Sequence, residues 1–243
     1  MRILTLNVHK GFSLFHRRFV LHELRDAIRA TDADLVFLQE IVGVNDRWAA
    51  RHPGWPVVSQ YEFLADEIWP DFAYGKNSVT DIGHHGNAIL SRQDIVHWQN
   101  VDVSLGNAER RALLYGQIGN GPAAIHVVCV HLGLTEGHRR FQLHGLQTLI
   151  NKHVPADAPL IVAGDFNDWR HHAANIMEGE LGMVEINKAR HGRCARTFPA
   201  RRPLLRLDRI YLRNFNKHEP VALPRLPWSR LSDHLPVLAS ASP

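Results

Sequence analysis

The chain has 243 residues, 45% hydrophobic and 21% charged, a composition typical of a folded soluble domain and not of a disordered chain. Its net charge of +4 is too small to indicate nucleic-acid binding by itself. No apolar run approaches the roughly 20 residues of a membrane-spanning helix, and the first segment turns polar too soon for a signal peptide. We therefore expect one cytoplasmic domain over residues 1–243.

The cysteine content narrows the class of protein further. Cys129 and Cys194 are the two cysteines of the sequence, which is too few for a disulfide framework. They are also far apart, with no CxxC spacing, and this argues against a structural zinc site. Any metal site is therefore expected to use oxygen and nitrogen ligands.

Apolar periodicity in the first part of the chain predicts alternating strands and helices. Residues 3–8 form an expected buried strand, and residues 19–30 carry apolar side chains at helical spacing. The apolar run at residues 35–38 predicts a central strand that stops at Gln39 and Glu40. Residues 43–85 have weak periodicity and are expected to form a helix and long loops.

The remainder of the chain begins with short apolar segments. Strands are predicted at residues 88–90, 95–103, 112–118 and 123–130, which together indicate an antiparallel block with a turn at residues 119–122. A helix at residues 137–153 and a strand at residues 160–163 follow. Strands at residues 207–212 and 235–241 close the chain, with a loop containing Pro220, Pro224 and Pro227 between them.

Several predicted strands share one feature: the apolar run is followed directly by an acid, an amide or a histidine. In layered α/β folds, ligands bind where loops diverge at strand ends, so we expect these polar groups to converge on one pocket. The converging set contains Asn7, Glu40, His131, Asp165, Asn167, Asp208, Asp233 and His234.

This set predicts the class of chemistry. Oxygen-rich ligation without cysteine suits a hard divalent cation, Mg²⁺ or Mn²⁺, and the His-Glu-x-x-His string of many zinc enzymes is absent. A metal with nearby histidine and aspartate is suited to phosphoester hydrolysis. The sequence lacks a Gly-x-Ser-x-Gly elbow, a P-loop and a Gly-x-Gly-x-x-Gly string, so serine hydrolases, P-loop NTPases and Rossmann dehydrogenases are disfavoured.

Seven short strings carry a resemblance to a known family. In chain order they are Thr5-Leu6-Asn7, Leu38-Gln39-Glu40, Gly86-Asn87-Ala88-Ile89-Leu90-Ser91, His131-Leu132, Gly164-Asp165-Phe166-Asn167, Leu207-Asp208-Arg209-Ile210-Tyr211 and Ser232-Asp233-His234-Leu235-Pro236-Val237. The sequence thereby resembles the endonuclease/exonuclease/phosphatase (DNase I-like) superfamily from residue 5 to residue 237. The resemblance implies a four-layered α/β sandwich of two mixed, mostly antiparallel sheets with helices outside.

The resemblance also implies a metal site at one edge of the sandwich. Glu40 is similar to the principal metal ligand of the family, with Asn7 beside it. Asp233 is similar to the residue that supports the metal region. A Mg²⁺ or Mn²⁺ ion is the cofactor that this likeness implies.

Catalytic roles follow from the same resemblance. Asp165 resembles the residue that orients or activates the attacking water, with Asn167 as its hydrogen-bond partner. His234 is similar to the histidine that binds the scissile phosphate, and Asp208 to the carboxylate that fixes the tautomer of that histidine. His131 matches a second histidine that protonates the leaving group or holds the phosphate.

Three further residues are candidates for substrate contact. Asn87 fits either substrate contact or a turn, Arg111 either a phosphate contact or an exposed salt bridge, and His9 follows Asn7 by two positions. The adjacent histidines at positions 84–85 and 171–172 are interpreted as surface or loop residues.

The resemblance implies a metal-dependent phosphoric ester hydrolase, and the first expectation for its substrate is a nuclease acting on DNA or RNA. The alternative is a phosphoesterase of a lipid head group or small phosphate, similar to sphingomyelinases, supported by the loop around Thr197-Phe198-Pro199. A non-catalytic phosphate-binding protein is the third hypothesis. Neither membrane insertion nor an obligate protein partner is expected.

Overall fold

The computed structural model describes residues 1–106 and 109–243, and its strands form two six-stranded sheets. The first sheet has the order β11-β12-β1-β2-β4-β3 and contains β1 (Arg2–Asn7), β2 (Leu35–Asn45), β3 (Asp71–Thr80), β4 (Gly83–Ser91), β11 (Lys217–Val221) and β12 (Val237–Ser242). The second has the order β5-β6-β7-β8-β10-β9 and contains β5 (Ile95–Asp102), β6 (Ala112–Ile118), β7 (Ile125–His131), β8 (Leu160–Asp165), β9 (Val184–Glu185) and β10 (Asp208–Arg213).

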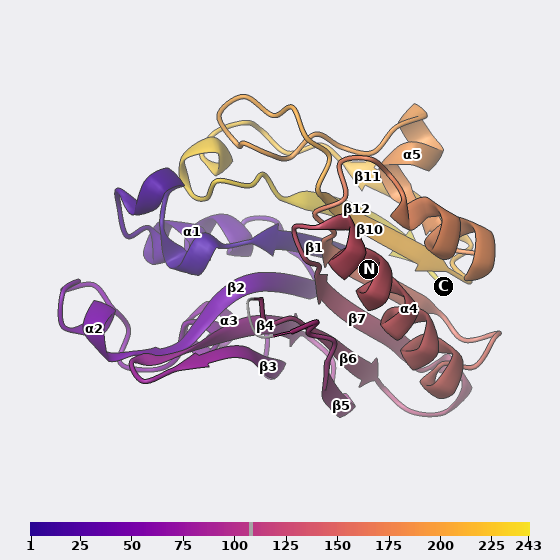
Figure 1. The fold of residues 1–243 in the computed structure, drawn as a ribbon, viewed down its shortest axis with the longest axis horizontal. Coiled ribbons are helices and arrows are strands. Elements are labelled where there is room, and N and C mark those ends of the chain that lie inside the picture. The colour runs from indigo at the N-terminus through magenta and orange to yellow at the C-terminus, as the bar shows by residue number, and fades with distance from the viewer. Residues whose placement is uncertain (107–108) are drawn as a thin grey trace.

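Helices cover the outer face of each sheet. α1 (Leu21–Arg29) and α3 (Gln60–Ala65) pack on the first sheet, while α4 (Glu136–His153) and the π-helix η4 (Asn175–Glu180) pack on the second. Figure 1 shows α4 crossing in front of its sheet. The short helices α2 (Asp46–Ala49) and α5 (Ile186–His191) lie in connections. The four-layered sandwich implied by the resemblance is therefore confirmed.

Apolar side chains fill the space between the two sheets. The first sheet contributes Ile3, Phe37 and Ile89, and the second contributes Leu114, Ile161 and Ile210, all fully buried. On the outside, Leu21, Leu24 and Ile28 lie on one stripe of α1 and are also fully buried. This double burial explains why the central strands read as continuous apolar runs.

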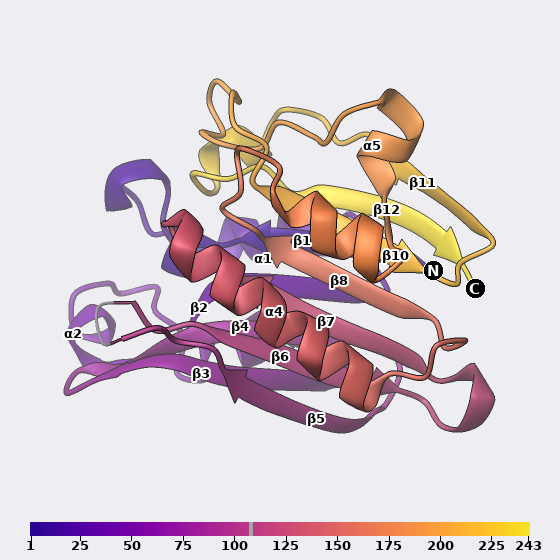
Figure 2. The ribbon, with the colours of Figure 1, turned by 45° about the vertical axis from the view of Figure 1, so that its right-hand side comes forward.

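Each sheet is mostly antiparallel but contains one parallel pair at its centre. β1 pairs with β2 in the first sheet, and β7 pairs with β8 in the second. The carboxyl ends of parallel strands point the same way, so all four strands deliver their last residues to one edge of the sandwich. Figure 2 shows both chain termini at the opposite end.

The strand expected at residues 35–38 does not stop at Glu40. β2 continues to Asn45, and its pairing with β4 shifts register between Leu38 and Ile41. Glu40 has a φ of 56° within this irregularity. A β-bulge thus turns the Glu40 side chain without ending the strand, which is a common device beside active sites.

Two other expectations were wrong in part. Residues 43–85 contain the whole of β3 besides α2 and α3, and β4 joins β3 and β2 instead of the antiparallel block that starts at β5. The proline-containing loop includes β11, which pairs with β12 alone and therefore lies at a sheet edge. An edge strand accommodates Pro220 because a missing N–H breaks no pairing on the solvent side.

Within the described residues, no helix is both long and apolar enough to cross a membrane. The expectations of one domain over residues 1–243 and of a cytoplasmic location stay predictions.

Candidate active site

The polar cluster is centred on Asp165, the last residue of β8. Across the second sheet, Asp165 is the register partner of His131 on β7 and of Asp208 on β10. Its side chain is 1% exposed. Three neighbouring strands of the sheet, β7, β8 and β10, therefore place a carboxylate between an imidazole and a second carboxylate, at the edge to which the parallel pairs point.

Hydrogen bonds fix the Asp165 carboxylate on both oxygens. The backbone N–H of Asn167 donates to Oδ1 at 2.9 Å, and Nδ2 of Asn7 donates to Oδ2 at 3.3 Å. The Nε2 atoms of His131 and His234 lie 3.6 and 3.8 Å from Oδ2. Burial raises the pKa of Asp165 to about 6, although the charge of His234 opposes this shift.

His234 forms a tight pair with Asp208. Its Nδ1 lies 2.8 Å from Oδ2 of Asp208, and both side chains are buried. Burial alone would lower the pKa of His234, but the carboxylates of Asp208 and Asp165 outweigh it and raise the pKa to about 10. The ring of Phe198 packs at 5.0 Å between centroids. His234 is thus held as an imidazolium whose Nε2 faces Asp165.

His131 has the opposite character. Burial and the nearby charge of Arg111 hold the pKa of His131 well below its ordinary value, and the carboxylate of Glu40 only partly offsets them. One neutral imidazole and one imidazolium therefore flank the same carboxylate. Such a pair of unlike histidines is suited to separate proton-transfer and charge-stabilising roles.

Glu40 contributes a second ionised carboxylate. Its Oε1 accepts from Nδ2 of Asn7 at 3.2 Å, and its Oε2 lies 3.4 Å from Nζ of Lys10. Burial alone would raise the pKa of Glu40, but nearby His131 and Lys10 outweigh it and lower the pKa to about 2. The bulge in β2 is what directs this side chain toward the end of β1.

Asp233 completes the edge from the C-terminal side. Its Oδ2 lies 3.8 Å from Nε2 of His9, while its Oδ1 accepts from Oγ of Ser232 at 3.3 Å. The same Ser232 hydroxyl also contacts the carbonyl oxygen of Asn7 at 2.7 Å. These contacts join the end of β1 to the segment before β12, so residues far apart in the sequence share one site.

The donor set fits a hard divalent cation. Asp165, Asp208 and His234 place one ligand atom each within 4.8 Å of one another, and the cluster as a whole is rich in carboxylate oxygens. However, His234 is already hydrogen-bonded through Nδ1 to Asp208 and is protonated, and a protonated imidazole is a poor ligand. Glu40 offers an ionised carboxylate outside that pair. Asn7 now presents its NH₂ group to both carboxylates, so coordination through its oxygen requires the amide to turn.

The structure does not bring all predicted substrate contacts into the cluster. Nδ2 of Asn87 donates to the carbonyl oxygen of Ala112 at 3.2 Å, which ties β4 to β6 across the sandwich. Arg111 is paired with Glu109 at 2.7 Å, its Nε donates to the carbonyl oxygen of Leu132 at 3.4 Å, and its charge acts on His131. Asn87 therefore has a structural contact, and Arg111 lies at the rim.

Sequence patterns did not identify three residues that lie near the site. Lys10 contacts Glu40, and Glu109 binds both Arg111 and Nδ1 of His138, the latter at 3.2 Å. His85, interpreted from the sequence as a surface or loop histidine, lies in β4 opposite Val42. Burial lowers the pKa of His85 to about 4, and Lys10 and Glu40 both act on it. Its place depends on strand register beyond the bulge, for which the local sequence carries no signal.

Comparison with known proteins supports the family resemblance that the seven sequence strings carry. The model of the Endonuclease/Exonuclease/phosphatase family matches residues 4–234. The "Uncharacterized protein YbhP" of Escherichia coli is 52% identical over 240 residues, covering 98% of this chain and 94% of that protein.

Solved structures share the whole fold. An endonuclease/exonuclease/phosphatase from Beutenbergia cavernae has a TM-score of 0.72 at 20% identity, covering 100% of this chain and 71% of its own. D. rerio TDP2 complexed with single strand DNA product has a TM-score of 0.68 at 18% identity, covering 100% and 99%. The mannosyl-6-phosphatase Bt3783 of Bacteroides thetaiotaomicron has a TM-score of 0.70 at 14% identity, covering 99% of each chain. At these identities the likeness concerns the fold alone.

Proposed function

The chain belongs to the endonuclease/exonuclease/phosphatase family, whose members hydrolyse phosphoester bonds, and from that premise we propose that it is a divalent-metal-dependent phosphodiesterase. The observation that carries the proposal is the placement of Asp165 between His131 and His234. Asp165 is a buried carboxylate with a raised pKa, and hydrogen bonds hold both of its oxygens. These are the properties expected of a general base that takes a proton from water.

In the proposed reaction, Asp165 accepts a proton from water as the water oxygen attacks phosphorus. The bond between phosphorus and the leaving oxygen then breaks. The imidazolium of His234, held by Asp208, donates a hydrogen bond to a phosphoryl oxygen and stabilises its developing negative charge. Neutral His131 holds the phosphate by donating a hydrogen bond from its ring N–H, and the leaving oxygen takes its proton from solvent water. Asn167 keeps Asp165 in position.

Glu40 would hold the Mg²⁺ or Mn²⁺ ion, with Asn7 beside it and Asp233 supporting the region. The bound cation would neutralise charge on the phosphate. Within the protein, Lys10 now balances the charge of Glu40, and His9 faces Asp233. Both side chains lie beside the carboxylates of the proposed metal site, so His9 is retained as a substrate contact.

The proposed machinery treats all phosphodiesters alike. A nucleic-acid backbone, the first choice from the sequence, and a lipid head group, the second, both offer a diester between two oxygens. Phosphomonoesters carry one more negative charge and lack a second ester group. The catalytic residues therefore predict which type of bond is hydrolysed. The surface around the site determines which substrate molecule is bound.

The test is hydrolysis of bis-p-nitrophenyl phosphate, p-nitrophenyl phosphate and supercoiled plasmid by the purified protein. Each substrate is assayed with Mg²⁺, with Mn²⁺ and with EDTA. We expect metal-dependent release of p-nitrophenol from the diester in preference to the monoester, abolished by EDTA. Plasmid nicking would identify a nuclease. Turnover that persists in EDTA, or a preference for the monoester, would contradict the proposal.

A further inference from the structure

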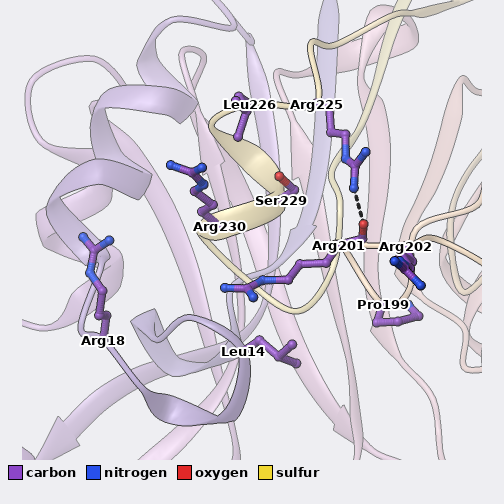
Figure 3. Close-up of a pocket in the computed structure, with 9 residues that line it drawn as sticks. All are labelled: Leu14, Arg18, Pro199, Arg201, Arg202, Arg225, Leu226, Ser229 and Arg230. Atoms are coloured by element: carbon purple, nitrogen blue, oxygen red, sulfur yellow. Dashed lines mark hydrogen bonds between the residues drawn. The ribbon is translucent and has the colours of Figure 1, made fainter.

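An arginine-lined pocket opens beside the candidate active site. It has a volume of about 940 Å³, and its walls come from three loops that are far apart in the sequence. Five of its nine lining residues are arginines, namely Arg18, Arg201, Arg202, Arg225 and Arg230. Figure 3 shows Arg201 extending toward the space between Arg18 and Arg230, with Leu14 on the opposite side from Leu226. We call this group of nine residues the arginine pocket.

The positive charge of the arginine pocket is almost uncompensated. Arg18 pairs with Glu23 at 2.6 Å, and in the described ranges 1–106 and 109–243 the other four have no carboxylate within salt-bridge distance. Among the residues that the structure describes, no aspartate or glutamate lines the pocket. Like charges gathered without counter-charges repel one another, so this arrangement favours an anionic ligand.

Three contacts connect the arginine pocket with the active site. Pro199 follows Phe198, whose ring packs on His234. The backbone N–H of Ala200 donates to the carbonyl oxygen of Asp233 at 2.7 Å. The η5 turn (Trp228–Arg230) leads directly into the segment that carries Asp233 and His234. A ligand in the pocket therefore lies next to the catalytic edge.

The loops that supply these arginines also carry exposed apolar side chains. Phe15 is 73% exposed, Leu204 65% and Leu226 55%, and each lies on a loop that also contributes an arginine to the pocket. The guanidinium of Arg17 lies 5.8 Å above the ring of Phe15. Loops that combine exposed apolar side chains with arginines are typical of surfaces that enter the boundary between lipid head groups and acyl chains.

We propose that the arginine pocket and its apolar rim bind the surface of a bilayer that contains anionic phospholipids. The arginines pair with lipid phosphates, while Phe15, Leu204 and Leu226 enter the acyl boundary. Docking in this way brings the catalytic edge to the phosphodiesters of lipid head groups. This last step rests on the proposed function, whereas the docking itself does not.

A polynucleotide is the competing anion. Proteins that bind single strands without sequence preference combine cations with aromatic stacking platforms. The exposed large apolar residues on these loops are one phenylalanine and three leucines, namely Phe15, Leu204, Leu205 and Leu226, and Phe15 already lies beneath Arg17. A leucine side chain has no aromatic ring on which a nucleobase can stack, whereas its burial among acyl chains is favourable. The observations therefore favour the bilayer.

The test is co-sedimentation of the full chain with vesicles of phosphatidylcholine alone or mixed with phosphatidylglycerol. We expect binding to the mixed vesicles only, weakened by added salt. Reversing two charges in Arg201→Glu/Arg230→Glu should reduce the partition coefficient about tenfold or more. Arg190→Glu/Arg193→Glu on and after α5 makes the same charge change outside the pocket and should leave most binding intact.

A second variant separates apolar insertion from charge pairing. Leu226→Ser removes an apolar tip without changing the charge and should weaken vesicle binding several-fold. All these variants should hydrolyse bis-p-nitrophenyl phosphate like the wild type, since the small diester needs no surface. Equal vesicle binding by wild type and Arg201→Glu/Arg230→Glu would overturn the proposal. So would arginine-dependent binding of single-stranded DNA with no vesicle binding. Vesicle binding without diester turnover would instead contradict the proposed function.

Discussion

The candidate active site and the arginine pocket adjoin each other, but they differ in whether their charged side chains have oppositely charged partners. In the active site every ionised group has a partner: Asp208 pairs with His234, and Glu40 with Lys10. In the arginine pocket four exposed cations have no carboxylate partner among the described residues. Buried charges must be paired because their desolvation is costly, whereas exposed ones remain hydrated until a ligand arrives. The first region is therefore built for fixed chemistry, and the second for recruitment.

The largest effect is expected from Asp208→Asn. Without the charge and hydrogen bond of Asp208, burial is opposed only by Asp165 and Asp233, so the pKa of His234 should fall from about 10 toward its ordinary value of 6.5. Loss of the imidazolium should reduce kcat roughly 10²–10⁴-fold with little change in KM. The measurements are steady-state kinetics and the NMR titration of His234 in EDTA. A variant with wild-type kcat would show that this pairing is structural.

Asp168→Ala should separate folding from catalysis. Asp168 follows Asn167 in the chain, but its side chain pairs with fully buried Arg209 at 3.2 Å and accepts from the backbone N–H of Ala173. Leaving that cation unpaired should lower the free energy of unfolding by about 3–5 kcal/mol. Urea denaturation measures this loss. Glu136→Ala, which removes the exposed contacts with Arg170 and His172, is the control and should cost less than about 1 kcal/mol.

Glu40→Gln should act through the metal. The uncharged amide keeps the shape of the side chain but loses the anionic oxygen, so apparent Mg²⁺ affinity should fall roughly 10–100-fold. Titration of diester turnover with Mg²⁺ measures the shift, and high Mg²⁺ should restore most of kcat. If kcat is lost at every Mg²⁺ concentration while metal affinity is unchanged, Glu40 acts on the substrate instead.

The pH profile should have an acidic limb set by Asp165. As a base Asp165 must be deprotonated, and its pKa is raised to about 6, so kcat/KM should fall as the pH drops through that value. Well below pH 6 the decline is about tenfold for each pH unit. The profile should stay flat above this limb until His234 loses its proton at about pH 10. Turnover that rises as the pH falls below 6 would contradict this assignment.

Binding of lipid to the arginine pocket should affect large and small substrates of the active site differently. Adding phosphatidylglycerol vesicles should inhibit plasmid nicking, if nicking occurs, while leaving hydrolysis of bis-p-nitrophenyl phosphate within about twofold, because only large substrates need the surface. Equal inhibition of both substrates would show that lipid blocks the catalytic edge itself.

The sequence could predict the strand ends because local apolar runs determine where the central strands stop. Asn7, His131 and Asp165 follow from such runs, and the two parallel pairs then bring them together. Glu40 was placed beside them for an incomplete reason, since a bulge and not the end of β2 directs its side chain. Bulges depend on register with a distant strand, which no local pattern records.

Lys10, His85 and the arginine pocket show the same limit. His85 reaches the site only because β2 continues past Glu40 and pairs Val42 with it. The basic residues at positions 17–18 and 201–202 were visible as separate strings. Their assembly with Arg225 and Arg230 depends on how three loops pack at one edge of the sandwich. Tertiary packing, and not propensity, decides these neighbours.

The most direct measurement compares Asp165→Asn with the wild type on bis-p-nitrophenyl phosphate at saturating Mg²⁺. The amide keeps the size of the side chain but cannot accept a proton from water, so kcat should fall roughly 10²–10⁴-fold. Asp157→Asn, an exposed aspartate before β8, serves as the control and should retain full turnover. Circular dichroism should show that both variants are folded. Turnover within about twofold of the wild type by folded Asp165→Asn would contradict the account.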